Sequence, residues 1–253
     1  PPPTARLAEV RLLELVGVSV SFDGLRALDD VSFRVDEGEI LGLIGPNGSG
    51  KSTAFNVVTG VIPARRGRVI FDQQDITGVA PHRIARLGIG RTFQLVRPFV
   101  HLTALDNVLA GAMFGPLGAK SRRAALDRAY HILERVGLAD KAHVKAVSLT
   151  VRERKWLEVG RALAGDPKLV LLDEFMAGIS PGDVPQAVQL VRDINDSGIT
   201  FVIVEHIVKA ITSACDRIVV LDAGRKLAEG SVSEVVDDPA VIAAYLGTRR
   251  ARG

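Results

Sequence analysis

Apolar residues recur along the chain with two different periods. Short runs rich in β-branched residues alternate with stretches of helical spacing, a pattern typical of an α/β fold with a mainly parallel sheet. The runs Ile40–Ile44, Leu169–Leu172 and Phe201–Val204 are almost wholly apolar, which predicts strands buried on both faces. Two early runs instead alternate apolar and polar residues, which predicts strands with one face in water. The predicted strands are Leu12–Phe22, Val31–Val35, Glu39–Ile44, Gly67–Phe71, Lys168–Leu172, Thr200–Val204, Ile218–Leu221 and Lys226–Glu229.

The middle of the chain has the helical period alone. From about Leu102 to Leu163 no convincing strand interrupts it, so this segment is predicted to be a helical insertion in the sheet domain. Near the C-terminus, Val232–Leu246 predicts two short helices broken at Asp238-Pro239, followed by a basic tail that we expect to be solvated. The residues that define one apolar helix face in the insertion are Ala125, Ala129, Ile132, Leu133 and Val136.

Composition excludes several classes of protein. The chain has 253 residues, with 32 basic and 29 acidic side chains, and a net charge of +3 is too mild to indicate nucleic-acid binding. Cys215 is the only cysteine, which excludes an intramolecular disulfide and a cysteine-cluster metal site and fits a reducing compartment. The apolar runs are far shorter than the ~20 residues that span a bilayer. We therefore expect a soluble, intracellular protein.

A glycine-rich segment lies between the run Glu39–Ile44 and a predicted helix, Lys51–Val58. It matches the phosphate-binding pattern G-x-x-x-x-G-K-[ST] in the required strand–loop–helix context, and a glycine turn without a ligand is the alternative. Successive backbone N–H groups and the helix dipole would surround the phosphates. We expect Lys51 to reach the β- and γ-phosphates and Ser52 to offer its hydroxyl to Mg²⁺. The predicted ATP-binding residues here are Gly45, Pro46, Asn47, Gly48, Ser49, Gly50, Lys51, Ser52 and Thr53.

Two carboxylates follow the apolar run Lys168–Leu172. We expect Asp173 to hold Mg²⁺ through its water shell, as the second acidic element of such ATPases. Glu174 would then lie beside the γ-phosphate, where it could orient or deprotonate the attacking water. The alternative is an acidic pair that faces solvent at the end of a strand.

Taken in order, these motifs resemble the ATP-binding subunits of ABC transporters, from about Leu12 to Leu246. The resemblance implies a P-loop NTPase (RecA-like) α/β fold: a mainly parallel sheet core with an N-terminal antiparallel β subdomain and an inserted α-helical subdomain. It divides the chain into three parts. These are a nucleotide-binding core at residues 8–94 and 164–230, a helical signature subdomain at 95–163, and a C-terminal extension at 231–253.

Three further residues acquire roles from this resemblance. Gln94 matches the Q-loop glutamine, which would touch Mg²⁺ or the attacking water. His206, after a buried run, matches the switch histidine and would stabilise charge at the γ-phosphate. Phe22 matches the aromatic residue that stacks on adenine, although an aromatic on an alternating strand is often a core residue. Without the ordered motifs, a lone glutamine would be interpreted as solvated and a lone histidine as structural.

The narrower resemblance is to the ATPases of branched-chain amino acid importers, and within them to the longer of the two subunits. Urea- and lipopolysaccharide-exporting ATPases are related neighbours. The resemblance implies ATP and Mg²⁺ as cofactors, a second ABC ATPase subunit in a homo- or heterodimer, two transmembrane permease subunits and an extracytoplasmic solute-binding protein. It implies a peripheral location on the cytoplasmic side of the inner membrane. The matching segments are Gly90–Gln94, Arg97–Phe99, Leu102–Val108, Ala177–Ile179 and Ala244–Gly247.

The signature of this family, Leu-Ser-x-Gly-Gln at the start of a helix, is altered here. The spacing to Arg161 places it at Leu149–Glu153, whereas a register that begins at Val147 leaves two residues too many. Thr150 and Glu153 form a capping-box pattern, so a helix should begin here. Its free N–H groups could then face the ATP of the opposite subunit. The residues that replace Ser, Gly and Gln are Thr150, Arg152 and Glu153.

Arg152 allows three interpretations. Its side chain would crowd a backbone that must approach the γ-phosphate, which is the outcome we favour, or it would add a positive charge there as an arginine finger does, or it would point to water. Phe175, Ser180 and Ile207 also depart from the family pattern. We therefore predict that the ATP site built from this chain's signature and the partner's P-loop is weakened. The P-loop site of this chain would then carry most of the hydrolysis.

The loop after Gln94 is unusually apolar. It is predicted either to dock a short permease helix or to be buried against the helical segment. Two other functions compete with a transport ATPase: a soluble ABC ATPase of translation or DNA repair, and a nucleotide-binding subunit that no longer hydrolyses. The first usually has two ATPase halves or a long insertion, which this chain lacks. The apolar residues of the loop are Leu95, Val96, Pro98, Phe99 and Val100.

Overall fold

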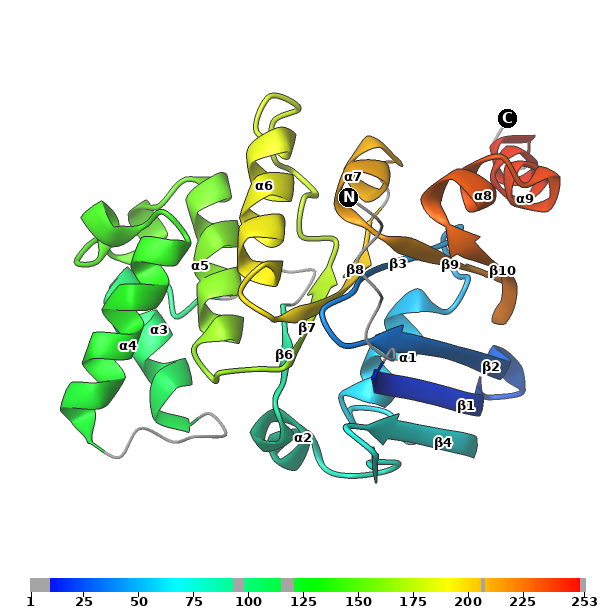
Figure 1. Cartoon of the computed structure of the whole chain (residues 1–253), viewed down its shortest axis with the longest axis horizontal. Helices are drawn as coiled ribbons and strands as arrows, with labels where there is room; N and C mark the ends of the chain where they lie inside the picture. Colours follow the sequence, from blue (N-terminus) through cyan, green and yellow to red (C-terminus); the bar gives the residue numbers. More distant parts are fainter. Residues whose placement is uncertain (1–9, 93–97, 115–120, 206–207, 251–253) are drawn as a thin grey trace, which may run out of the picture.

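Two β-sheets organise the computed structural model, which describes residues 10–92, 98–114, 121–205 and 208–250 (Figure 1). An antiparallel sheet has the strand order β2-β1-β4-β5, and a six-stranded sheet has the order β10-β9-β3-β8-β7-β6. Helix α1 (Lys51–Val58) packs between them, because one buried cluster contains residues of both sheets and of this helix. The strands of the first sheet are β1 (Arg11–Phe22), β2 (Leu25–Asp36), β4 (Arg66–Phe71) and β5 (Gln74–Asp75).

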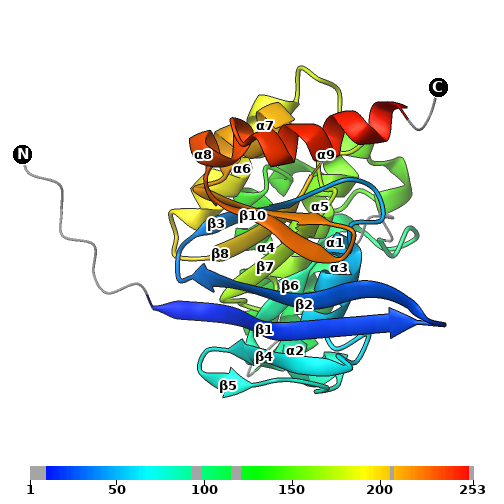
Figure 2. The same cartoon turned by 90° about the vertical axis from the view of Figure 1, so that its right-hand side faces the viewer.

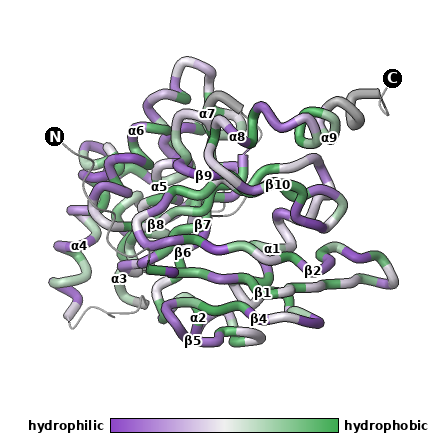
Figure 3. Tube along the Cα trace, turned by 45° about the vertical axis from the view of Figure 1, so that its right-hand side comes forward, coloured by the Kyte–Doolittle hydropathy of each residue, from purple (hydrophilic) through white to green (hydrophobic). Residues whose placement is uncertain are grey.

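The six-stranded sheet is parallel except at one edge. Strand β3 pairs in parallel with β8 and β9, β7 pairs in parallel with β6 and β8, and β10 is antiparallel to β9. Every residue of β7 and β8 is buried, as their apolar runs predicted, and hydrophobic positions line the central strands (Figure 3). The strands are β3 (Ile40–Ile44), β6 (Ile89–Arg91), β7 (Leu169–Asp173), β8 (Thr200–Val204), β9 (Arg217–Asp222) and β10 (Arg225–Ser231).

The helical stretch expected between residues 102 and 163 is confirmed within the described residues. It contains three helices that pack against one another, together with two 3₁₀ turns, Ala139–Lys141 and Ala146–Ser148. Helix α4 buries the face that its period predicted and begins at Ser121, whose hydroxyl accepts a hydrogen bond from Ala124 N at 3.2 Å. The three helices are α3 (Ala104–Phe114), α4 (Arg122–Arg135) and α5 (Val151–Leu163).

The C-terminal segment forms the two predicted helices, α8 (Val232–Val236) and α9 (Pro239–Arg250). The break falls at Asp237 and Asp238, and the Asp238 carboxylate accepts a hydrogen bond from Ala240 N at 2.7 Å. Helix α9 lies beside β10 at the edge of the six-stranded sheet (Figure 2). The remaining helices are α2 (Pro81–Leu87), α6 (Val184–Asn195) and α7 (Val208–Ala214). Among the described helices, none has both the length and the apolar character that a membrane span requires.

Candidate active site

The glycine-rich loop joins β3 to α1, as its sequence context predicted. Gly45 begins the loop at a φ of 150°, and a Cβ atom there would lie 2.0 Å from the carbonyl oxygen of Leu221 on β9. No side chain fits in that space, so glycine is required where the loop passes the end of the neighbouring strand. Gly50 is the N-cap of α1 in the left-handed conformation, and its carbonyl accepts the first helical hydrogen bond, from Ala54 N.

Lys51 folds back over this loop. The residue is 6% exposed, and Nζ donates hydrogen bonds to the carbonyl oxygens of Gly45 at 2.8 Å and Pro46 at 2.9 Å. Burial lowers the pKa of Lys51, while the charges of Glu174 and Asp173 raise it. Both acidic residues predicted from the end of β7 are therefore close enough to act on the lysine of the loop.

The residues at the start of α1 and the end of β7 could bind a phosphate group and a cation that prefers oxygen ligands. Ser52, in the first turn of α1, is exposed, and Thr53 beside it is half-buried. The helix N-terminus supplies N–H groups and a favourable dipole for an anion. Hydroxyl and carboxylate oxygens are the donors that Mg²⁺ prefers, and Ser52 and Asp173 supply one of each. These residues could hold a magnesium–nucleotide complex.

Asp173 ends β7 and forms a buried ion pair that the sequence did not predict. Arg91 Nη2 donates to Asp173 Oδ2 at 3.0 Å, and the two side chains are 9% and 5% exposed. Nη1 of the same guanidinium donates to Asn56 Oδ1 at 2.7 Å and Thr59 Oγ1 at 3.1 Å, both on or directly after α1. Arg91, at the end of β6, thus links helix α1 to Asp173, the predicted metal-binding carboxylate. No sequence signal connected residues 82 positions apart.

Glu174 is held by its backbone in an uncommon conformation. Its φ is 48°, which costs energy for a residue other than glycine and is often found at functional sites. Its N–H donates to the carbonyl of Val204 at the end of β8 at 2.9 Å, and its carbonyl accepts from Lys155 Nζ at 3.3 Å. Glu205, also unpredicted, is buried and accepts a hydrogen bond from Met176 N. The loop after β7 is therefore fixed from β8 and from α5.

Two predicted site residues, Gln94 and His206, lie outside the described residues, as does Ile207. Phe22 lies at the β1–β2 hairpin, paired with Leu25, and 45% of the residue is exposed. The interpretation of Phe22 as a core residue is therefore wrong, and its predicted contact with adenine stays a prediction.

The capping box predicted for the altered signature is confirmed. Thr150 is the N-cap of α5: its hydroxyl accepts from Glu153 N at 3.2 Å, and Glu153 Oε2 accepts from Thr150 N at 2.8 Å. The hydrogen bond from Thr150 N lowers the pKa of Glu153, which keeps its carboxylate charged. This geometry supports the register that begins at Leu149.

Arg152 does not point freely into water, as one of the three interpretations expected, and its two predicted effects on the ATP of the opposite subunit stay predictions. Its Nη1 donates to Asp183 Oδ1 at 2.8 Å and to Gln186 Oε1 at 3.1 Å. The Ser180 hydroxyl donates to the other oxygen of Asp183 at 2.8 Å, and this bond and Arg152 lower the pKa of Asp183. The guanidinium therefore connects the altered signature to the segment before α6 and does not point freely into water.

A substitution at the cap tests this register. Thr150→Ala removes the hydrogen bond from Glu153 N and is expected to lower the free energy of unfolding by about 1 kcal/mol. Ser148→Ala is the control, because Ser148 is exposed and would be the key residue only in the register that begins at Val147. Urea unfolding of both variants measures the effect. A larger loss in Ser148→Ala would show that the register is wrong.

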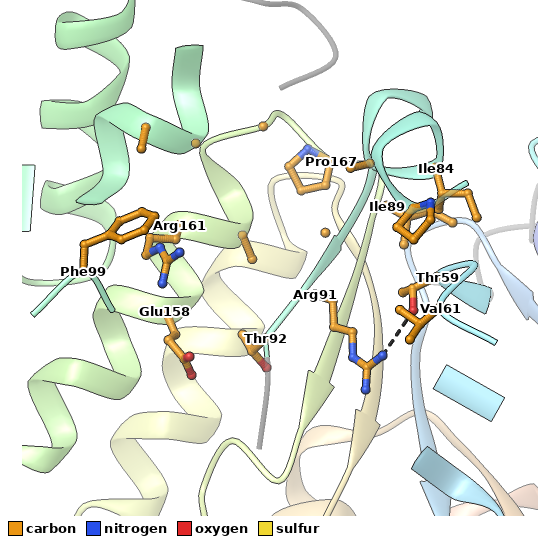
Figure 4. A pocket seen from close by; sticks show the side chains of 17 residues that line it. Thr59, Val61, Ile84, Ile89, Arg91, Thr92, Phe99, Glu158, Arg161 and Pro167 are labelled. Carbon is orange, nitrogen blue, oxygen red and sulfur yellow. Dashed lines mark hydrogen bonds between the residues drawn. The ribbon is translucent and has the colours of Figure 1, made fainter. Parts of the chain in front are cut away.

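A groove of about 530 Å³ opens beside this site, between the helical part and the sheet (Figure 4). Phe99 and Arg161 line one side, with the guanidinium 4.9 Å from the ring centroid, and Ile84 and Ile89 line the other. Arg91 lies between the two sides. The loop at Phe99 is ordered by the fully buried Asn107, whose Oδ1 accepts from Phe99 N at 2.8 Å.

The loop after Gln94 was predicted either to be exposed for docking or to be buried, and its described residues include both cases. Pro98 is buried, Phe99 is 50% exposed and Val100 is 38% exposed. Leu95 and Val96 lie outside the described residues. An apolar surface is thus exposed at Phe99 and Val100, next to the groove.

Comparison with known proteins gives two family matches. Residues 28–177 match the family described as ABC transporter, and residues 225–251 match the one described as branched-chain amino acid ATP-binding cassette transporter. The chain is 36% identical over 249 residues to the high-affinity branched-chain amino acid transport ATP-binding protein BraF of Pseudomonas aeruginosa, covering 93% of this chain and 98% of the relative. It is 34% identical over 249 residues to LivG of Escherichia coli K12, with the same coverage.

Solved structures agree with these matches. An ABC transporter cassette in its ADP conformation superimposes with a TM-score of 0.85 at 34% identity, over 94% of this chain and 99% of that chain. A dimeric cassette in a post-hydrolysis state, bound to ADP and phosphate, superimposes with a TM-score of 0.78 at 26% identity, over 87% and 99% of the two chains.

Proposed function

The chain belongs to the ABC transporter family of ATP-binding cassettes, which are ATPases, and we propose that it powers an importer of branched-chain or similar amino acids. The observation that carries this proposal is the presence of an intact phosphate loop together with the match of residues 225–251 to the family described as branched-chain amino acid ATP-binding cassette transporter. Relatives named as branched-chain amino acid transport ATP-binding proteins support the same solute class.

The residues of the site suggest how ATP is bound and cleaved. The N–H groups of residues 45–53 and the Lys51 ammonium would bind the phosphates, and Phe22 would stack on adenine. Ser52, Asp173 and Gln94 would hold Mg²⁺, which would neutralise charge on the phosphate oxygens. Glu174 would accept a proton from the attacking water, and His206 would donate a hydrogen bond to the γ-phosphate oxygen as charge develops.

A second ATPase subunit would complete each site. The dimeric neighbour supports an assembly of two cassettes. In such a dimer the N-terminus of α5, with Thr150, Arg152 and Glu153, would face the ATP of the partner. In this signature Arg152 stands at the position where the family has glycine. Its guanidinium is paired with Asp183 and is therefore not free to face the ATP. We infer that the dimer is asymmetric and that this chain's own P-loop, opposed by an intact partner signature, carries most of the turnover.

A membrane permease is the proposed partner at the groove. Exposed apolar side chains at Phe99 and Val100 border the groove of about 530 Å³, and Arg161 places a positive charge beside them. The chain would then reside at the cytoplasmic face of the membrane through this contact, with the solute-binding protein on the opposite side.

Co-purification tests the proposal. The tagged full chain, expressed with the permease and ATPase genes of its own operon, is expected to retain both permease subunits after detergent extraction. Phe99→Asp should reduce this recovery at least tenfold without changing ATP binding. Val236→Asp, which places the same charge at an exposed valine on α8, should leave it unchanged.

The same preparation separates the alternatives. A chain that hydrolyses ATP and recovers no permease would be a soluble ATPase. A chain that recovers permease and binds ATP, while the complex hydrolyses only at the partner's P-loop, would be the hydrolysis-impaired subunit. Equal recovery of permease by the wild type and Phe99→Asp would contradict docking at the groove.

A further inference from the structure

One face of helix α5 lies against the segment between β7 and α6. Arg152, Lys155 and Trp156 are spaced i, i+3 and i+4 along the helix, so their side chains leave it on the same side. Arg152 reaches Asp183, at the end of the segment. The other two side chains reach its start, at the residues directly after Asp173. The helix that begins at the altered signature therefore also contacts the loop that carries this chain's own predicted general base.

Lys155 is bonded to the backbone of Glu174. The lysine is 4% exposed, and its Nζ donates to the Glu174 carbonyl at 3.3 Å. Ala177 N donates to the same carbonyl at 3.1 Å and closes a turn over residues 174–177. Burying an ammonium group is costly unless it forms hydrogen bonds, so the lysine and the turn are held together.

Trp156, the only tryptophan of the chain, packs on the second residue of this turn. Its ring centroid lies 5.4 Å from that of Phe175, with an interplanar angle of 35°. Phe175 is 1% exposed, and an aromatic pair at this distance contributes more than its buried area alone. Phe175, one of the departures from the family pattern, therefore anchors the turn to α5.

The turn needs such contacts because its first residue is strained. Glu174 has a φ of 48°, and a residue other than glycine stays in this conformation only where its surroundings enforce it. From β8, the Val204 carbonyl accepts a hydrogen bond from Glu174 N at 2.9 Å. From α5, the enforcing contacts are those of Lys155 and Trp156. Without them the φ of Glu174 could relax, and its carboxylate would move.

We propose that Lys155 and Trp156 are positioning residues for ATP hydrolysis, which hold the Glu174 carboxylate where it accepts a proton from the attacking water. The inference rests on the proposed function, because it assumes that Glu174 is the general base of an ATP site. It gives α5 two functions: its N-terminus faces the ATP of the partner, and its second turn fixes the general base of this chain's own site. The two ATP sites of a dimer are thereby connected through one helix.

Two substitutions remove the contacts one at a time. Lys155→Met removes the ammonium group and keeps an apolar side chain, and Trp156→Leu removes the ring. Each is made in this chain only, within the complex with the partner ATPase and permease subunits. The part of the phosphate release that Glu174→Gln abolishes is expected to fall about ten- to a hundredfold in kcat, because a displacement of about 1 Å costs that much. KM for ATP and the affinity for fluorescent ATP should change less than about twofold, because the lost interaction acts in the transition state.

Three control variants distinguish positioning from a general loss of packing. Trp156→Phe keeps an aromatic ring opposite Phe175 and should restore most of the rate. Lys145→Met and Tyr130→Leu remove the same kinds of side chain from exposed positions of the helical part, and both should hydrolyse ATP as the wild type does. A lower melting temperature with an unchanged kcat in Lys155→Met and Trp156→Leu would show a structural role alone and overturn the inference.

A double substitution tests whether the two residues act through Glu174. In the Glu174→Gln background, Lys155→Met and Trp156→Leu should cause no further loss of phosphate release, because the carboxylate that they position is already absent. A further loss as large as in the wild-type background would place their effect elsewhere, such as at the partner's ATP, and overturn the inference. A wild-type complex that hydrolyses no ATP would overturn the proposed function and this inference with it.

Discussion

Glu174→Gln is expected to abolish ATP hydrolysis by the assembled transporter while ATP still binds. Glu174 directly follows the carboxylate that ends β7, and it lies close enough to Lys51 to raise the pKa of that lysine. Its backbone is held by Val204 and Lys155, so glutamine can occupy the same φ of 48° and lose only the negative charge. Loss of a general base reduces turnover by roughly 10²- to 10⁴-fold.

Phosphate release by the complex measures this effect, and fluorescent ATP confirms binding. The control is Glu134→Gln, which removes the same charge from an exposed position on α4. The substitution is made in this chain only, with the partner ATPase subunit left intact. If the complex retained near-normal turnover, the partner's P-loop would be the main site of hydrolysis and the proposed asymmetry would be wrong.

The elements that the sequence predicted are those whose local signal is strong. All eight predicted strands are present, because each shows an apolar or alternating pattern over four residues or more. The short strands β5 and β6 were not predicted, since two or three residues show no period. Strand β6 forms because β7 already offers a partner edge at Leu169 to Leu171, which is a tertiary cause.

In the candidate site, too, the features formed by sequence neighbours were predicted and the contacts between distant residues were not. The phosphate loop, the acidic end of β7 and the capping box at Thr150 depend on neighbours in sequence, and each takes the expected local geometry. The Arg152–Asp183 contact joins residues 31 positions apart, and the Arg91–Asp173 contact joins residues 82 positions apart. Hydrophobic periodicity does not predict such pairs, because each partner alone resembles an ordinary polar residue.

The buried pair of Arg91 and Asp173 is the long-range contact with the largest expected effect on stability. Both side chains are almost fully buried, so neither charge can recover water if its partner is removed. Arg91→Gln is expected to lower the free energy of unfolding by about 3–5 kcal/mol, the usual loss when one member of a buried ion pair is removed. Arg192→Gln, in an exposed pair with Asp216 at 3.5 Å, should cost less than about 1 kcal/mol.

A double-mutant cycle isolates the pair from the other bonds of the guanidinium. Asp173→Asn in the Arg91→Gln background removes the stranded charge, so urea unfolding should show that the double variant is more stable than Arg91→Gln alone. Additive losses would mean that the hydrogen bonds to Asn56 and Thr59 dominate. Arg91 ends β6 and joins Asn56 and Thr59, at the end of α1, to Asp173 on β7. A favourable coupling between Arg91 and Asp173 would therefore show that β6, β7 and α1 are stabilised as one unit.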